Sequence, residues 1–394
     1  MYRIGEEEIQ AVAEVIRSKK LNRTNKGEIR AVWNFEREMK EHMGADYFFL
    51  LTSGKAALIS SLIAMGVGPG DEVIVPAYTY QATAIAVLAV GAIPVIVDID
   101  ETLTIDPKAI EANISEHTKA IIPVHMQGMP CNMDAIMEIA KKHNLYVLED
   151  ACQAVGASYK GKMLGTVGDA GAYSFNYFKI LTAGEGGGVI TNNREIFENA
   201  FIYHDSSGIK WLGNEMEGFD QKLFAGSEYR ISEITAAILR VQLKRLDGIV
   251  ADLRAVKQKI KDAIKDTGIK FRPSNDPEGD NGTILALSFD DAETATAFCK
   301  EGGASIDLLS HMGKHIYNQW DSVMMKRGAL NPKHDAFLME DNQGLNMNYT
   351  PDMCQKTLDT LAKTVAVFIN PDWTDEEIQK KIDELKYAAA KTLK

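Results

Sequence analysis

The stretch "GDEVIVPAYTYQATAIAVLAVGAIPVIVDID", residues 70–100, contains two short apolar runs separated by a helical segment. Neither run alternates apolar with polar residues, so we expect both faces of each strand to be covered. Similar runs alternate with helical stretches between about residues 30 and 200, at 48–54, 120–128, 145–154 and 171–176. Buried strands that alternate with helices are typical of a mostly parallel sheet with helices on each side. The sequence therefore predicts an α/β doubly wound domain.

The remaining patterns divide the 394-residue chain into three parts. Residues 1–30 predict an amphipathic helical arm, because Ile4, Ile9, Val12 and Ile16 recur at helical spacing. Residues 31–249 form the large domain. A long helical pattern over 229–268 leads into a smaller α+β domain, residues 250–394, with a strand-like run at 283–289. We expect its last helix to open with a capping box from Thr374 to Glu377.

Charge and cysteine usage exclude several classes of protein. The chain has 43 Lys and Arg against 55 Asp and Glu, a net charge of −12, without the basic block that nucleic-acid binding needs. Neither a signal peptide nor an apolar run of about 20 residues is present, so we expect a cytoplasmic protein without membrane contact. The cysteines show no CxxC spacing and predict reduced thiols: Cys131, Cys152, Cys299 and Cys354.

No metal site is predicted either. His311 and His315 lie four residues apart, but the pair lacks the Glu of an HExxH helix. An isolated pair at this spacing is more often on the surface than at a metal, so we expect no metal ligand here.

The segment "LLTSGKAAL", residues 50–58, resembles part of a nucleotide-binding loop but fails as one. Phe49 stands where the first glycine of that loop is needed, and Ala56 replaces its Ser or Thr. The segment still passes directly from strand to helix. The N–H groups of Gly54 and Lys55 could therefore hold a single phosphate at a helix N-terminus. The glycines of 66–72 precede a strand and form a turn, so a nicotinamide fingerprint is absent.

Asp150 closes the apolar run "LYVLED". A carboxylate at the end of a buried strand needs a partner, because an unpaired buried charge is strongly disfavoured. The partner could be an internal arginine or a backbone cap. It could also be the cationic ring nitrogen of a cofactor, which the carboxylate would keep protonated.

Lys179 lies in the apolar and glycine-rich segment "SFNYFKILTAGEGGGV", residues 174–189. It could be a surface lysine whose stem covers apolar neighbours. Burial would instead lower its pKa and favour a neutral amine that forms a Schiff base with a carbonyl. The glycines that follow suit a backbone that a bulky group approaches closely. Together with Asp150 and the phosphate-type turn, Lys179 predicts a pyridoxal phosphate site.

These segments resemble the DegT/DnrJ/EryC1/StrS sugar aminotransferases, which have the aspartate-aminotransferase fold (fold type I). The resemblance covers roughly the first 245 residues and is most specific over 174–187; the C-terminal part matches loosely. It implies that Lys179 forms the internal aldimine and moves the proton during transfer. It also implies that Asp150 contacts the pyridinium nitrogen of the cofactor and that Gln153 contacts its phenolic oxygen. Tyr80 would stack on the ring, and Ser174, Gly54 and Lys55 would bind the phosphate.

Two positions depart from the family pattern. The family commonly has a small hydroxyl residue where Lys55 stands. At the position of Glu228, the family commonly has an Asn that reaches the phosphate in the neighbouring subunit. A carboxylate facing a phosphate is electrostatically unfavourable. Either Lys55 and Arg230 compensate with positive charge, or this loop is placed differently.

The resemblance also implies a reaction. Related dehydratases carry histidine at the position of Lys179, so the lysine favours amino transfer, with glutamate as donor and a keto or aldehyde sugar as acceptor. The segments 175–188 and 331–353 resemble the subgroup that makes 8-amino-3,8-dideoxy-manno-octulosonate for lipopolysaccharide; a nucleotide-linked keto-deoxyhexose is the alternative acceptor. The family also implies a homodimer with shared sites. A non-catalytic regulator that binds the cofactor is the alternative from another class.

Overall fold

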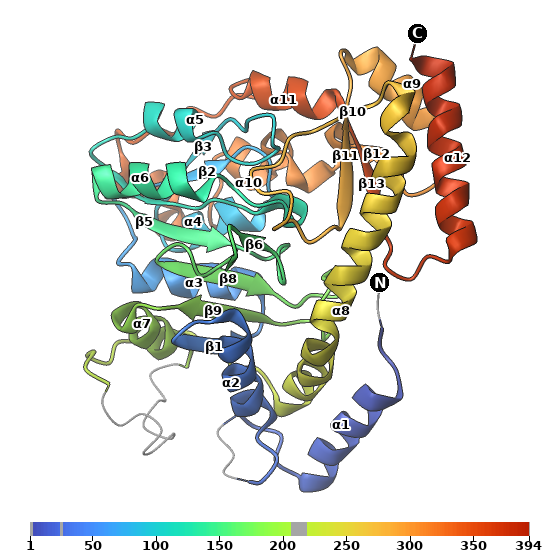
Figure 1. The fold of residues 1–394 in the computed structure, drawn as a ribbon. Coiled ribbons are helices and arrows are strands. Elements are labelled where there is room, and N and C mark those ends of the chain that lie inside the picture. The colour runs from blue at the N-terminus through green and yellow to red at the C-terminus, as the bar shows by residue number, and fades with distance from the viewer. Residues whose placement is uncertain (1–2, 24–26, 206–218, 394) are drawn as a thin grey trace.

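A seven-stranded sheet forms the centre of the large domain in the computed structural model, which describes residues 3–23, 27–205 and 219–393 (Figure 1). Its strand order is β1-β9-β8-β5-β4-β2-β3. The strands are β1 (Tyr47–Leu51), β2 (Glu72–Pro76), β3 (Ile93–Val97), β4 (Thr118–Ile121), β5 (Tyr146–Asp150), β8 (Ala170–Ser174) and β9 (Gly187–Thr191). Only β9 runs antiparallel to its neighbours, β1 and β8. The predicted mostly parallel sheet is confirmed, and β9 is the strand that the sequence patterns did not indicate.

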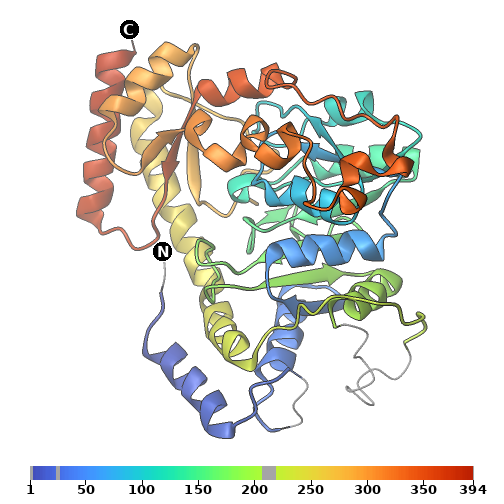
Figure 2. The ribbon, with the colours of Figure 1, turned by 180° about the vertical axis from the view of Figure 1, so that it is seen from behind.

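Helices cover both faces of this sheet, as the lack of alternation predicted. One buried cluster contains Leu50, Ile74 and Val147, and the cluster on the other face contains their chain neighbours Leu51 and Leu148. Successive residues of a strand point to opposite faces, so every strand residue here can be apolar. The covering helices are α2 (Ala31–Met43), α3 (Gly54–Ala64), α4 (Ala82–Ala89), α5 (Pro107–Ala112), α6 (Met133–His143) and α7 (Arg194–His204). Figure 2 shows α3 and α4 on the side hidden in Figure 1.

The longest helix, α8 (Glu233–Ile264), connects the large domain to the small one (Figure 1). It begins at Ser232, whose hydroxyl accepts a 3.3 Å hydrogen bond from the N–H of Thr235. Its buried residues recur at helical spacing along the whole length. The helix therefore supports both cores at once, and the predicted boundary between residues 249 and 250 falls within it.

The small domain contains an antiparallel sheet of order β10-β11-β13-β12, flanked by helices. As predicted, Thr374 and Glu377 form a capping box at the last helix. The strands and helices are β10 (Lys270–Phe271), β11 (Ile284–Ser288), β12 (Ile306–Leu308), β13 (Thr364–Phe368), α9 (Ala292–Glu301), α10 (Asp321–Met324), α11 (Gln355–Ala362) and α12 (Asp375–Thr392). A short hairpin, β6 (Ser158–Tyr159) and β7 (Lys162–Met163), belongs to the large domain. Of the described helices, none combines the length and the apolar character that crossing a membrane requires.

The N-terminal arm forms α1 (Glu6–Ser18), which packs on α8 with a different face from the one that its apolar pattern indicated. Ile9 and Ile16 are 60% and 55% exposed, whereas Val15 and Glu8 are buried. Glu8 accepts 2.7 Å hydrogen bonds from Gln242 and Arg245 of α8. The isoleucine face of the arm is therefore not covered by the chain's own described residues.

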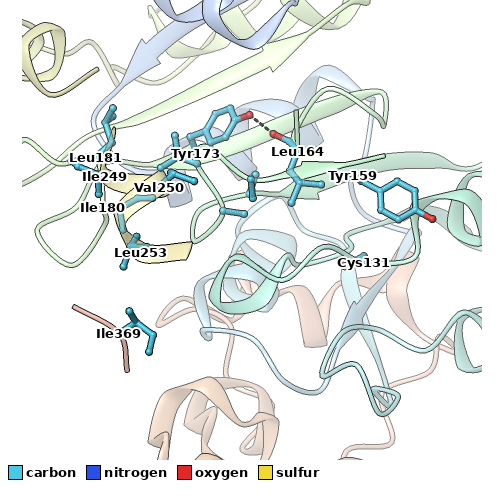
Figure 3. Close-up of a cluster of buried hydrophobic side chains, with 14 of the residues drawn as sticks. Cys131, Tyr159, Leu164, Tyr173, Ile180, Leu181, Ile249, Val250, Leu253 and Ile369 are labelled. Atoms are coloured by element: carbon cyan, nitrogen blue, oxygen red, sulfur yellow. Dashed lines mark hydrogen bonds between the residues drawn. The ribbon is translucent and has the colours of Figure 1, made fainter. Parts of the chain in front are cut away.

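A buried cluster anchors the segment around Lys179 (Figure 3). Ile180 and Leu181 belong to the same cluster as Ile249 and Leu253 of α8. The hydroxyl of Tyr173, near the end of β8, donates a hydrogen bond to the carbonyl of Leu164. Burying aliphatic side chains of this size contributes roughly 1.5–3 kcal/mol each. The two residues after Lys179 thus hold it in place.

Candidate functional site

Asp150 lies at the carboxyl end of β5 and is only 5% exposed. Its Oδ2 accepts a 2.8 Å hydrogen bond from the hydroxyl of Thr83, and its Oδ1 accepts a 3.1 Å bond from the N–H of Cys152. Among the described residues, no basic side chain lies within ion-pair distance of the carboxylate. The group is therefore oriented by neutral donors, and its negative charge is left uncompensated.

Lys179 is held by a loop that closes on itself. The N–H groups of Phe175 and Tyr177 donate 2.9 Å hydrogen bonds to the carbonyls of Gly186 and Gly184. The half-buried Lys179 lines a cavity of about 370 Å3 together with Cys152, Gln153 and Thr283. Within the described part of the chain, its amine forms no hydrogen bond or ion pair. The cavity thus contains one amine that is free to react.

Cys152 is the common neighbour of the predicted residues. Its backbone contacts Asp150, its side chain lines the cavity with Lys179, and a Cβ atom at Gly54 would lie 2.7 Å from its Sγ. Burial raises the pKa of the Cys152 thiol well above its usual value, and the nearby Asp150 raises it further. The thiol therefore stays protonated and serves as a small packing group.

The predicted phosphate-binding turn, at the start of α3, contacts Ser174. Ser53 caps α3 by accepting a 3.1 Å hydrogen bond from the N–H of Ala56. A Cβ atom at Gly54 would lie 2.8 Å from the Cβ of Ser174, so the first turn of α3 touches the serine. Backbone N–H groups, a hydroxyl and a helix N-terminus together suit a phosphate. The side chain of Lys55 is exposed at the rim of this turn.

The glycine run after Lys179 has a different cause from the one that we expected. A Cβ atom at Gly187 would lie 2.2 Å from the carbonyl oxygen of Ser53, and one at Gly188 would lie 2.4 Å from the ring of Phe48. These glycines let β9 approach the neighbouring backbone and ring of the protein itself. The close approach that the glycines indicated is therefore present at these two positions, and it is made by groups of the protein itself.

Glu228 forms an ion pair within the chain. Arg230 donates a 2.6 Å hydrogen bond to Oδ1 of Asp205 and a second one to the carboxylate of Glu228. The N–H of Thr52 donates a 3.0 Å bond to the carbonyl of Tyr229, which places this segment beside the phosphate turn. Arg230, one of the two cations expected to compensate Glu228, thus shares its single positive charge between Glu228 and the buried Asp205, and Lys55 does not take part in this ion pair.

Gln153 and Tyr80 occupy different parts of the site. Oε1 of Gln153 accepts a 3.2 Å hydrogen bond from the N–H of Gln127, and both residues line the cavity. Tyr80 is 45% exposed and stands at the rim, where its ring lies 5.2 Å from that of His315. Lys179 and Gln153 thus line one cavity together with Cys152. Asp150 and Gly54 contact Cys152 from outside this lining, Ser174 lies next to Gly54, and Lys55 and Tyr80 are exposed.

His315 is a site residue that the sequence reasoning missed. The expectation of a surface pair suits the exposed His311, but His315 lines the cavity. Burial lowers the pKa of His315, and the charge of Lys179 lowers it further, so the ring is neutral at pH 7. Its Nδ1–H donates a 3.1 Å hydrogen bond to the carbonyl of Met312, which leaves Nε2 as an acceptor.

Thr83 and Thr283 were also missed. Thr83 lies 67 residues before Asp150 in the sequence, and its hydroxyl donates a hydrogen bond to the Asp150 carboxylate. The Thr283 hydroxyl donates a 2.6 Å hydrogen bond to the carbonyl of Gln127. Thr83 follows Thr79 by four residues, and the two hydroxyls are 2.8 Å apart. This spacing, just after a strand, is the signal that could have indicated Thr83.

The segment 331–353, which resembles an octulosonate-specific subgroup, packs on the large domain. Nδ2 of Asn342 donates hydrogen bonds to the carbonyls of Gly91 and Ala336, at 2.8 and 2.6 Å. The hydroxyl of Tyr349 donates a 2.8 Å bond to the carbonyl of Pro94. None of this fully described segment lines the cavity of Lys179. Asn342 and Tyr349 of this segment thus have a role in packing.

Comparisons with known proteins agree with this geometry. The profile of the DegT/DnrJ/EryC1/StrS aminotransferase family matches residues 2–307. The chain is 41% identical over 249 residues to the spore coat polysaccharide biosynthesis protein SpsC of Bacillus subtilis (strain 168). This alignment covers 62% of this chain and 63% of SpsC. It is 42% identical over 221 residues to the GDP-perosamine synthase of Caulobacter vibrioides (strain ATCC 19089 / CIP 103742 / CB 15). This alignment covers 55% of this chain and 57% of the synthase.

The likeness in fold extends further than these alignments. The solved structure of the aminotransferase from Psychrobacter cryohalolentis superposes with a TM-score of 0.82 at 27% identity, over 99% of this chain and 98% of that one. The chain spans about three-fifths of the length of the two curated relatives above. The matched residues include Asp150, Ser174 and Lys179. The chain belongs to the DegT/DnrJ/EryC1/StrS aminotransferase family, whose aminotransferases use pyridoxal 5′-phosphate.

Proposed function

We propose that this protein is a pyridoxal-phosphate-dependent aminotransferase that moves an amino group from glutamate to the carbonyl of a sugar. The uncompensated carboxylate of Asp150 carries the proposal, because it is buried next to the cavity of Lys179 without a basic partner among the described residues. A cationic ring nitrogen is the partner that would make this arrangement favourable.

The residues fit the cofactor by the chemistry of their donors. The hydroxyl of Ser174 and the N–H groups of Gly54 and Lys55 would hold its phosphate. Asp150 would accept a hydrogen bond from its ring nitrogen, and Gln153 would lie on the side of its phenolic oxygen. Tyr80 would cover the ring from the rim. When bound, the cofactor supplies an electron sink for chemistry at the carbon that carries the amino group.

Lys179 would carry the proton. The side chain of Lys179 is half-buried, lines the cavity and has no acidic partner among the described residues. A neutral amine can take a proton from a substrate carbon and return it at a neighbouring atom. The buried Ile180 and Leu181 fix the position of this amine.

His315 would contribute to the binding of the acceptor. Its ring is neutral, and its Nε2 remains an acceptor beside the cavity. A sugar hydroxyl can donate to such a nitrogen without the cost of desolvating a second charge.

For the acceptor, we favour a nucleotide-linked keto-deoxyhexose. The name of the GDP-perosamine synthase supports an acceptor of this kind, and the name SpsC supports polysaccharide synthesis. The 8-oxo form of 3-deoxy-manno-octulosonate, a precursor for lipopolysaccharide, is the second candidate. The packing role of residues 331–353 removes one reason to prefer it.

We further propose that the protein acts as a homodimer. The exposed isoleucine face of α1 supports this assembly. A second copy that covers Ile9 and Ile16 would remove apolar surface from water.

The test uses the two half-reactions. Glutamate added to the protein loaded with pyridoxal phosphate should shift the absorbance maximum to that of the pyridoxamine form and release 2-oxoglutarate. A nucleotide-linked 4-keto-6-deoxyhexose should then reverse the shift and yield an amino sugar by mass; an oxidised octulosonate forms the parallel arm. A protein that binds the cofactor but responds to no amino donor would be a non-catalytic regulator instead.

A further inference from the structure

A second cavity, of about 600 Å3, lies between the C-terminal half of α8 and the loop that follows β10. Two segments separate it from the candidate active site. Gln127 and Thr283 line the cavity of Lys179, whereas Met129 and Asp280 line the second cavity. Its volume is in the range of small-molecule sites. The mechanism proposed above does not use it.

Basic side chains dominate its polar walls. Arg254, Lys257, Lys261 and Arg272 face two acidic residues, Glu278 and Asp280. Lys257 forms a 2.5 Å ion pair with one of these acidic residues, Asp280. The other three cations have no carboxylate within ion-pair distance in the described part of the chain. The cavity therefore has a positive excess in a protein whose net charge is −12.

Neutral oxygen atoms fix the two arginines. Nε of Arg254 donates a 2.6 Å hydrogen bond to the carbonyl of Asp280, and Nη2 donates a 3.2 Å bond to the carbonyl of Gly279. Nε of Arg272 donates a 2.9 Å bond to the Thr364 hydroxyl, and Nη2 donates a 3.1 Å bond to the carbonyl of Thr360. Both guanidinium groups are thus pre-positioned, and their Nη1 atoms donate no hydrogen bond to the described residues.

The arrangement has an energetic cost unless an anion is present. Burial lowers the pKa of Arg272, and Glu101 offsets this only in part. A partly buried guanidinium normally pairs with a carboxylate or phosphate, as Arg230 and Arg245 do elsewhere in this chain. Arg272 and Arg254 line the cavity and have no carboxylate within ion-pair distance among the described residues.

The floor of the cavity is apolar. Phe271, Met129 and Leu285 line it, and Nζ of Lys261 lies 5.3 Å from the ring centroid of Phe271. An aromatic ring next to a lysine ammonium, in a cavity that two arginines also line, suits a ligand with an anionic end and an uncharged body.

We propose that this cavity is a second ligand site, which binds a small multivalent anion such as a phosphorylated or polycarboxylated metabolite through Arg254, Lys261 and Arg272. Arginine forks and a lysine ammonium are the donors that recognise phosphate and carboxylate groups. The site is separate from the cofactor and the sugar, and it does not depend on the proposed function.

Binding of pyrophosphate to the protein loaded with pyridoxal phosphate tests this directly, because the cofactor then fills the other phosphate site. Isothermal titration calorimetry should show one site per chain. Lys261→Gln and Arg272→Gln should each weaken binding about tenfold or more, as expected for loss of a charge-assisted hydrogen bond. Citrate, titrated in parallel, distinguishes a phosphate ligand from a polycarboxylate.

Lys259→Gln is the matched control. Lys259 lies two residues before Lys261 on α8 but pairs with Asp375, away from the cavity, so its loss should leave pyrophosphate binding unchanged. Lys261 forms no hydrogen bond or ion pair with the described residues, so its replacement keeps the test valid even if Arg272→Gln impairs folding. Failure of the wild-type protein to bind either anion, or equal affinity in Lys261→Gln, would overturn the proposal.

Discussion

The hydroxyl of Thr83 donates a 2.8 Å hydrogen bond to Oδ2 of Asp150. This neutral donor orients a buried carboxylate without cancelling its charge. An arginine at the same place would have satisfied Asp150 within the protein. The geometry instead leaves the charge available for a cation that comes with the cofactor, next to Cys152, which lines the cavity of Lys179.

Replacement of Thr83 by valine should therefore weaken cofactor binding while the protein stays folded. Valine keeps the shape of threonine but removes the donor to Oδ2, and hydrogen bonds to charged groups contribute about 1.5–3 kcal/mol. We expect the Kd for pyridoxal phosphate to rise about tenfold or more, measured by fluorescence titration. Thr267→Val is the control, because the Thr267 hydroxyl bonds only the carbonyl of Ile264. Unchanged cofactor affinity in Thr83→Val would contradict this role.

Gly54 should tolerate no side chain. A Cβ atom would lie 2.7 Å from Sγ of Cys152 and 2.8 Å from Cβ of Ser174. Gly54→Ala should lower the free energy of unfolding by about 1–3 kcal/mol, as overpacking does, and should weaken cofactor binding by moving α3 away from Ser174.

Gly248→Ala is the matched control for Gly54→Ala. Gly248 lies inside α8 with no atom within 4 Å of a built Cβ. Alanine there should raise the free energy of unfolding by about 0.5–1 kcal/mol. Urea denaturation distinguishes the two signs, and equal effects at both glycines would show that the contact with Ser174 is unimportant.

His204 should make stability depend on pH. It is fully buried, and burial lowers its pKa well below the usual 6.5. The unfolded chain therefore binds this proton at a higher pH than the fold does. The free energy of unfolding should fall as the pH drops below about 6.5, by at most about 1.4 kcal/mol per pH unit for this group.

Urea denaturation at several pH values between 5 and 8 measures this slope. His204→Phe keeps an aromatic ring against Phe49 and should make the slope shallower. His334→Gln, at an exposed histidine, serves as the control. A slope that is the same in His204→Phe and the wild type would refute the assignment.

Much of the site was predictable because parallel strands bring their carboxyl ends to one edge. Gly54, Asp150 and Ser174 follow or end β1, β5 and β8, so their meeting follows from the fold class. Thr83 and His315 were not predictable in this way. They reach the site through contacts between distant segments, such as the 2.9 Å bond from the N–H of Thr79 to the carbonyl of His315.

Some sequence patterns have more than one possible structural cause, and the sequence alone does not distinguish between them. The glycines at 187 and 188 relieve contacts with Ser53 and Phe48 inside the fold. The apolar stripe of the N-terminal arm predicted an amphipathic helix, and α1 packs on α8 not through this stripe but through Val15 and a hydrogen-bonded Glu8. A pattern identifies an amphipathic helix without saying which surface covers it.

That stripe gives a prediction for the proposed dimer. Replacing both Ile9 and Ile16 by glutamate puts charge on the exposed face of α1 and should shift the protein from dimer to monomer in light scattering after size exclusion. Glu14→Gln, a change at an exposed residue of the same helix, should leave the dimer intact. A wild-type protein that is monomeric at micromolar concentration would contradict the proposed assembly.

The most direct test of the account identifies the amine that bonds the cofactor. The protein loaded with pyridoxal phosphate is reduced with borohydride, digested and analysed by mass spectrometry. The account predicts one phosphopyridoxyl group per chain, on Lys179, and its loss in Lys179→Ala. A label on Lys55 or another lysine, or no label on a protein that folds normally, would contradict it.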